Sequence, residues 1–256
     1  MIAGARRVVA EREQLNKINV FPVPDGDTGS NLAFTLGGVL NGALSRRTAG
    51  VGDLLRRVSD DAIDSARGNS GAILAQFFTG VAEKIGESPT VRLEALADAI
   101  RAGSASARQA LAEPREGTIL SVIGAFANAL DRDSDARNVR PWFARGLEQA
   151  RRALANTPNQ LAVLQRAGVV DAGGQGFVDL LEGIDGFIRS GAVQEAGAPA
   201  DAGSDLEAEM AHEDLRDTDP EHRWCSECLL LGEGLDRSGL RAAVSDLGAS
   251  CVVVAG

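Results

Sequence analysis

The sequence has few of the side chains on which several common kinds of protein chemistry depend. Its 256 residues include no tyrosine, two histidines, three cysteines and eight phenylalanines. Both histidines, His212 and His222, lie in one acidic stretch, so histidine-based acid–base or triad chemistry is excluded from the first 190 residues. All three cysteines follow residue 224, which is too few and too clustered for a disulfide scaffold and fits a reducing compartment.

Long apolar runs are also missing. No segment approaches the roughly 18 apolar residues of a membrane span, and the N-terminus lacks the apolar core and cleavage site of a secretory signal. We therefore expect a cytoplasmic protein without a membrane span. The net charge of −10 argues against nucleic acid as the main partner, and 44% hydrophobic residues are typical of a globular chain.

The negative charge is concentrated between Gln194 and Arg223, where ten acidic residues accompany only two basic ones. This stretch is rich in Ala, Gly and Pro, and it cannot bury enough apolar surface to offset the ordering of its backbone. We interpret it as a solvated linker, with an acidic interaction tail as the alternative. The predicted organisation is a first domain over 1–192, an acidic linker over 193–222 and a partial α/β segment over 223–256.

Apolar residues recur at helical spacing throughout the first domain, and strand-like alternation is scarce. The pattern predicts an all-helical body. Its eight helices are expected near 2–16, 29–45, 52–67, 69–86, 91–112, 117–130, 138–155 and 174–190. After the linker, the sequence predicts strands over 224–231 and 251–254 with a helix over 238–247, an incomplete β-α-β unit.

The segment NVFPVPDGDTGSN, which begins at Asn19, carries two carboxylates, Asp25 and Asp27, behind two prolines that restrict the backbone. Closely spaced oxygen ligands suit a hard cation such as Mg²⁺, which uses one or two carboxylates together with substrate phosphates. Thr28 to Asn31 then open a helix whose backbone N–H groups are suited to a phosphate. The alternative is an ordinary Asp-Gly turn with a Thr or Ser cap.

Three further segments place glycine or a small polar residue at a helix start. ARGNSGAIL, beginning at Ala66, predicts a second phosphate site or a plain Ser/Asn cap. EGTIL places Thr118 at a helix start, where we favour a cap. GVVDAGGQGF contains Asp171, which is either a helix cap or a residue that positions a ligand. Cys225 and Cys228 form a C-x-x-C pair, for which buried cysteines on a strand are favoured over a partial metal site with His222.

Together, in this order and spacing, the four segments resemble the N-terminal kinase domain of the bacterial fatty acid kinase catalytic subunits (FakA). That domain is similar to DhaL, the nucleotide-binding subunit of dihydroxyacetone kinase. The resemblance implies a mainly α fold, a DhaL-like eight-helix antiparallel barrel that binds ATP at one mouth through two Mg²⁺ ions. It also implies that residues 223–256 open a middle domain that continues further in relatives.

The resemblance also implies roles for individual residues. Asp25 and Asp27 are the expected catalytic residues and Mg²⁺ ligands, with Asn19 as a weaker third ligand because the family's third aspartate is matched here by Val20. The expected nucleotide-binding residues are Thr28, Gly29, Asn31, Asn69, Ser70, Gly71, Thr118, Asp171 and Gly173.

The implied reaction is transfer of the γ-phosphate of ATP to a fatty acid carboxylate held by a DegV-like carrier protein, giving an acyl phosphate. Two alternatives stay open: a dihydroxyacetone (glycerone) kinase-type subunit, and an inactive nucleotide-binding regulatory remnant. The acyl-chain preference and the oligomeric state stay open, with a homodimer as one alternative.

Overall fold

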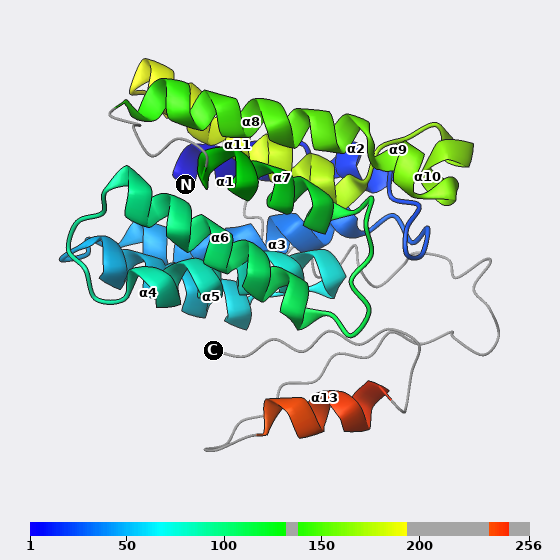
Figure 1. Cartoon of the computed structure of the whole chain (residues 1–256), viewed down its shortest axis with the longest axis horizontal. Coiled ribbons are helices and arrows are strands. Elements are labelled where there is room, and N and C mark those ends of the chain that lie inside the picture. Colours follow the sequence, from blue (N-terminus) through cyan, green and yellow to red (C-terminus); the bar gives the residue numbers. More distant parts are fainter. Residues whose placement is uncertain (132–137, 194–235, 246–256) are drawn as a thin grey trace.

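The computed structural model describes residues 1–131, 138–193 and 236–245, and these residues are mainly helical, without a β-strand. The mainly α fold class is therefore confirmed (Figure 1). No helix in these ranges is long and apolar enough to cross a membrane. The elements of the first domain are α1 (Ile2–Ala10), α2 (Arg12–Lys17), α3 (Thr28–Asn41), η1 (Ala43–Ser45), α4 (Val51–Asp64), α5 (Gly68–Ile85), α6 (Leu93–Ala110), α7 (Ile119–Asp131), α8 (Val139–Ala155), α9 (Thr157–Gln160), α10 (Ala162–Ala167) and α11 (Ala172–Ser190).

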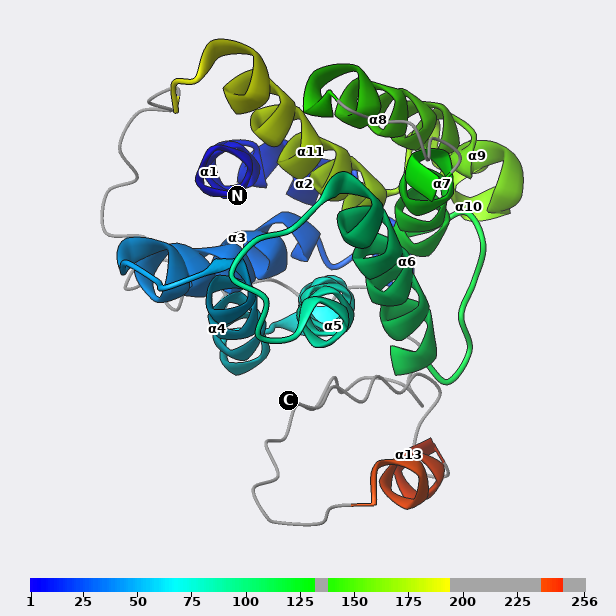
Figure 2. The ribbon, with the colours of Figure 1, turned by 60° about the vertical axis from the view of Figure 1, so that its left-hand side comes forward.

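Eight of these helices pack side by side in a closed ring. Starting from α1, each of α3, α4, α5, α6, α7 and α8 contacts the next, and α11 closes the ring by packing on both α8 and α1. Figure 2 shows these helices surrounding a common interior. The ring explains why most helical segments have apolar stripes, because most helices turn one face to the shared core and the other to solvent. The exception is α5, in which every residue from Gly71 to Ala82 is buried.

The core contains a cluster of aromatic rings supplied by four helices. Phe177 on α11 makes edge contacts with Phe77 on α5 and Phe126 on α7, with ring centroids 5.5 and 6.0 Å apart. Phe126 in turn packs against Phe143 on α8 at 5.6 Å. The cluster therefore joins helices that are far apart in sequence.

Two differences from the predicted helices have local causes. The helix expected over 2–16 divides into α1 and α2 at Glu11, whose backbone leaves the helical region. The sequence predicts no helix between 155 and 174, but the short helices α9 and α10 lie there. Pro158 lies in the first turn of α9, where a proline removes no helical hydrogen bond. Beyond the linker, α13 (Arg237–Ser245) confirms the expected helix, whereas the two predicted strands lie outside the described residues.

Replacing Phe177 by Ala should lower the free energy of unfolding by about 3–5 kcal/mol, because it removes a ring that is 2% exposed and joins three helices. The matched control is Phe187→Ala on the same helix, where the side chain is 45% exposed and a change below about 1 kcal/mol is expected. Urea unfolding measures both. Equal losses in the two variants would contradict the aromatic core.

Candidate functional site

The acidic loop between α2 and α3 is held by a single buried amide. Asn19 is 5% exposed, and its Nδ2 donates to the Val23 carbonyl at 2.9 Å and to Asp25 Oδ1 at 2.8 Å. Its Oδ1 accepts a hydrogen bond from the Thr28 hydroxyl, the first residue of α3. Asn19 therefore joins the start, middle and end of the loop and orients Asp25.

The two carboxylates of this loop lie within hydrogen-bonding reach of each other. Burial first, and the nearby charge of Asp25 second, raise the pKa of Asp27 to about 6 against an opposing hydrogen bond from Asn31. The protein thus holds two like charges together on a partly desolvated loop. A bound cation would offset this repulsion.

Asn31 connects the acidic loop to the start of α5. Its side chain is 4% exposed and hydrogen bonds to Asp27, and its Oδ1 has no hydrogen-bond partner among the described residues. Gly68, at the start of α5, lies so close that a β-carbon there would be 2.3 Å from Asn31 Nδ2. Gly68 also has φ +57°, a conformation that glycine adopts readily. Only glycine lets α5 begin directly against the acidic loop.

The four predicted motifs come together at one end of the ring. A β-carbon on Gly173, in the first turn of α11, would lie 3.3 Å from both Ser70 Oγ on α5 and Ile119 Cβ on α7. Since Gly68 on α5 contacts Asn31 on α3, the helices α3, α5, α7 and α11 all begin near one another. The structure therefore brings the sequence-predicted site residues into one region.

These four helix starts differ in how their backbone N–H groups are satisfied. In the described ranges, neither α3 nor α5 has a side-chain cap hydrogen bond. By contrast, Thr118 Oγ1 accepts from Leu120 N at 3.4 Å at the start of α7, and Asp171 accepts from Gly174 N at 2.7 Å at the start of α11. The start of α5 thus has no side-chain cap, while in the first turn of α3 the Ser30 N–H already donates to Asn16 Oδ1. Backbone N–H donors at a helix start are in general suited to an anion.

Asp171 is hydrogen bonded to the starts of two different helices. Its buried carboxylate accepts backbone hydrogen bonds from Gly174 on α11 and from Ile119 on α7, so it ties two helix starts together. Burial raises its pKa to about 6 in spite of these two bonds. The helix-cap alternative describes this geometry, and a direct contact of Asp171 with nucleotide stays a prediction.

Two supporting residues escaped the sequence analysis. Asn16 on α2 accepts from Ser30 N and donates to Ser30 Oγ, both at 3.0 Å, which fixes the first turn of α3. Glu116 accepts from Ser121 Oγ and pairs with Arg108, and these contacts lower its pKa and hold the turn before α7. The contact of Asn16 could not be found from spacing, because it depends on the packing of α2 on α3. Glu116, by contrast, bonds a residue only five positions away and stands at the start of the EGTIL segment.

The oxygen ligands of the loop suit a hard cation that also contacts phosphate. Within residues 1–131, 138–193 and 236–245 no three metal-binding carboxylate, histidine or cysteine side chains cluster. Asp25 and Asp27 nevertheless form a pair, and the unpartnered Asn31 Oδ1 lies beside it. Two carboxylates with remaining positions for water and phosphate are typical of Mg²⁺ sites. Asn19 is a poorer candidate ligand because both ends of its amide already hold the loop.

The family model for the DAK2 domain matches residues 22–186, which is well over half of the chain. The protein belongs to the DAK2 domain family, whose members are kinase-type, nucleotide-binding domains.

Two similar proteins come from staphylococci. An uncharacterized protein of Staphylococcus epidermidis (strain ATCC 12228) is 31% identical over 260 residues, covering 99% of this chain and 47% of the relative. An uncharacterized protein of Staphylococcus aureus (strain USA300) is 30% identical over the same shares. The chain therefore spans about half the length of the curated relatives that it matches.

The buried carboxylate of Asp171 gives a pH-dependent prediction. Its pKa of about 6 exceeds the ordinary value of 3.8, so the folded protein takes up a proton between pH 7 and pH 5 that the unfolded chain does not. Wild type should therefore gain about 1 kcal/mol in unfolding free energy relative to Asp171→Asn as the pH falls from 7 to 5. Urea unfolding of both proteins at both pH values tests this. A difference that is the same at pH 7 and pH 5 would contradict the burial of this charge.

Proposed function

We propose that the protein is a cytoplasmic, Mg²⁺- and ATP-dependent phosphotransferase domain that phosphorylates a fatty acid carboxylate presented by a DegV-like carrier protein. The observation that carries this proposal is the carboxylate pair of Asp25 and Asp27 beside the uncapped starts of α3 and α5. The DAK2 domain family supports ATP as the phosphate donor. The fatty acid acceptor rests on the sequence resemblance described above.

The site matches the charge pattern of a nucleotide triphosphate bound with metal. Helix starts supply backbone N–H donors and the positive end of a helix dipole for phosphate oxygens. Thr28 and Gly29 begin α3, and Asn69 and Ser70 lie in the first turn of α5. We propose these residues as the contacts of the phosphates. Asp25 and Asp27 would hold Mg²⁺, which supplies neutralisation of the phosphate charge when bound.

The proposed transfer needs little covalent help from the protein. An ionised carboxylate oxygen attacks the γ-phosphorus of ATP, forming a carboxyl–phosphate bond, while the bond to the β-phosphate oxygen breaks and ADP leaves with the electron pair. Because a carboxylate is already ionised near neutral pH, no general base has to remove a proton. This agrees with the absence of histidine from the sequence before residue 212. The residues of the site act by positioning and by charge.

A second candidate acceptor is dihydroxyacetone or a similar small sugar, bound by a separate subunit. The DAK2 family match favours it, because that domain is of the dihydroxyacetone kinase type. The two candidates share the nucleotide site and differ in the partner that presents the acceptor.

Replacing Asp25 by Asn should weaken Mg²⁺-dependent ATP binding by more than about a hundredfold, because even residues that only support metal ligands contribute roughly 10–100-fold. The Asn oxygen can still accept the hydrogen bond from Asn19, so the loop conformation should persist. Isothermal titration calorimetry with ATP and Mg²⁺ measures the effect. Asp60→Asn, an exposed carboxylate on α4, is the control and should bind as wild type does. Unchanged affinity in Asp25→Asn would contradict the assignment.

The acceptor is tested by supplying the chain with ATP, Mg²⁺ and either a fatty-acid-loaded DegV-like carrier or a dihydroxyacetone-loaded binding subunit. The proposal expects an acyl phosphate, trapped by hydroxylamine and detected by mass spectrometry, only with the first carrier. Dihydroxyacetone phosphate with the second would support the sugar kinase alternative. ATP binding without either product would instead indicate a regulatory nucleotide-binding role, and would overturn the proposed activity for this chain.

A further inference from the structure

A cavity of about 450 Å³ lies between α1, α2, the turn that precedes α11, and α11 itself. Its lining includes Arg7, Glu11, Leu15, Val169, Gln175 and Asp179. Two further lining residues, Ile18 and Val170, directly precede Asn19 and Asp171 in the chain. The cavity therefore adjoins the candidate nucleotide site without containing any residue assigned to it.

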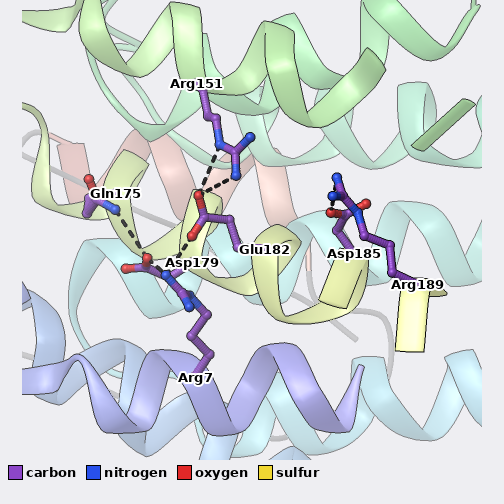
Figure 3. Close-up of polar contacts among 7 residues, drawn as sticks. All are labelled: Arg7, Arg151, Gln175, Asp179, Glu182, Asp185 and Arg189. Atoms are coloured by element: carbon purple, nitrogen blue, oxygen red, sulfur yellow. Dashed lines mark hydrogen bonds and ion pairs between the residues drawn. The ribbon is translucent and has the colours of Figure 1, made fainter. Parts of the chain in front are cut away.

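One side of the cavity carries a buried carboxylate whose negative charge is only partly balanced by its neighbours. Asp179 is 4% exposed, and its Oδ1 lies 3.2 Å from Gln175 Nε2 and 3.6 Å from Arg7 Nε (Figure 3). Arg7 is shared, because its Nη2 lies 2.6 Å from Glu182 Oε2. Glu182 also pairs with Arg151 at 2.8 Å, so Glu182 has two close arginine partners, whereas Asp179 has only the more distant Arg7. Asp179 keeps only weak compensation for its charge.

The surroundings add further negative charge. Burial raises the pKa of Asp179. The hydrogen bond from Gln175 and the charge of Arg7 oppose the rise and the charges of Glu11 and Glu182 add to it, so that the resulting pKa is about 6. At pH 7.5 this carboxyl group is therefore mainly ionised, in a place where its charge costs free energy. A positive group entering the cavity from solvent would offset that cost.

The remaining walls combine polar and apolar residues, and the volume suits a small ligand. Val169 and Val170 in the turn before α11 are partly exposed and supply hydrocarbon surface. Small-molecule sites typically have volumes of roughly 300–1,000 Å³ and combine apolar walls with a few polar groups. The cavity has both features.

We propose that this cavity binds a small organic cation, an ammonium or guanidinium group on a short alkyl stem. The cationic group pairs with Asp179 and Glu11, and the stem packs against Val169 and Val170. A small anion is disfavoured, because two carboxylates face the cavity against one arginine that is already engaged.

Calorimetric titration of the whole chain with agmatine at pH 7.5, without nucleotide, tests this proposal. Agmatine should bind, and butyrate, an anion of similar stem length, should not. Asp179→Asn should weaken agmatine binding at least tenfold. Asp185→Asn is the matched control and should leave binding unchanged. Asp185 is a buried carboxylate on the same helix, its Oδ2 lies 2.8 Å from Arg189 Nη2, and it does not line the cavity (Figure 3).

A second variant keeps the test decisive if Asp179→Asn unfolds. Val169→Phe places a larger side chain in the turn that borders the cavity, leaves Asp179 intact and should also reduce agmatine binding at least tenfold. No agmatine binding to wild type, equal binding to all variants, or equal binding of butyrate would each overturn the proposal. Because no nucleotide is present, these outcomes leave the proposed phosphotransferase activity untouched.

Discussion

The site depends on one buried amide, the side chain of Asn19. Its two ends connect the Val23 carbonyl, Asp25 and Thr28, which lie four, six and nine residues further along the chain. Without this connection a loop carrying two carboxylates would separate them, because like charges repel and extended loops are favoured by entropy. With it, Asp25 and Asp27 stay together beside the first turn of α3. The rest of the ring serves to bring further helix starts to the same place.

Negative and positive groups lie side by side at this end of the molecule. Negative charge gathers on the acidic loop, and burial raises the pKa of Asp27. Beside it, α3 and α5 begin without a cap from their N-cap side chains in the residues that the structure describes, so the positive ends of two helix dipoles lie in this region. A cation held by the carboxylates and an anion held by the helix starts satisfy both. Metal-bound nucleotide carries both kinds of charge in one ligand.

The mainly helical fold was predictable, because apolar periodicity and the helix breaks at proline and glycine are local properties of the chain. So was the gathering of functional residues in four motifs, each of which begins a helix. The contact of Asn16 with Ser30 was not predictable, because it depends on how α2 packs on α3. Nor could spacing show that Asp171 caps two helices at once, since Ile119 lies far away in sequence. Short-range patterns determine helices, whereas the partners of buried polar groups are decided by tertiary packing.

The most direct test of the account is a crystal structure of the protein with Mn²⁺ and a nonhydrolysable ATP analogue. Manganese takes the same oxygen ligands as magnesium and is identified by its anomalous signal. The account predicts anomalous density beside Asp25 and Asp27, with phosphate oxygens at the starts of α3 and α5. Metal and phosphates bound elsewhere, with the two carboxylates turned to solvent or making only protein contacts, would contradict it.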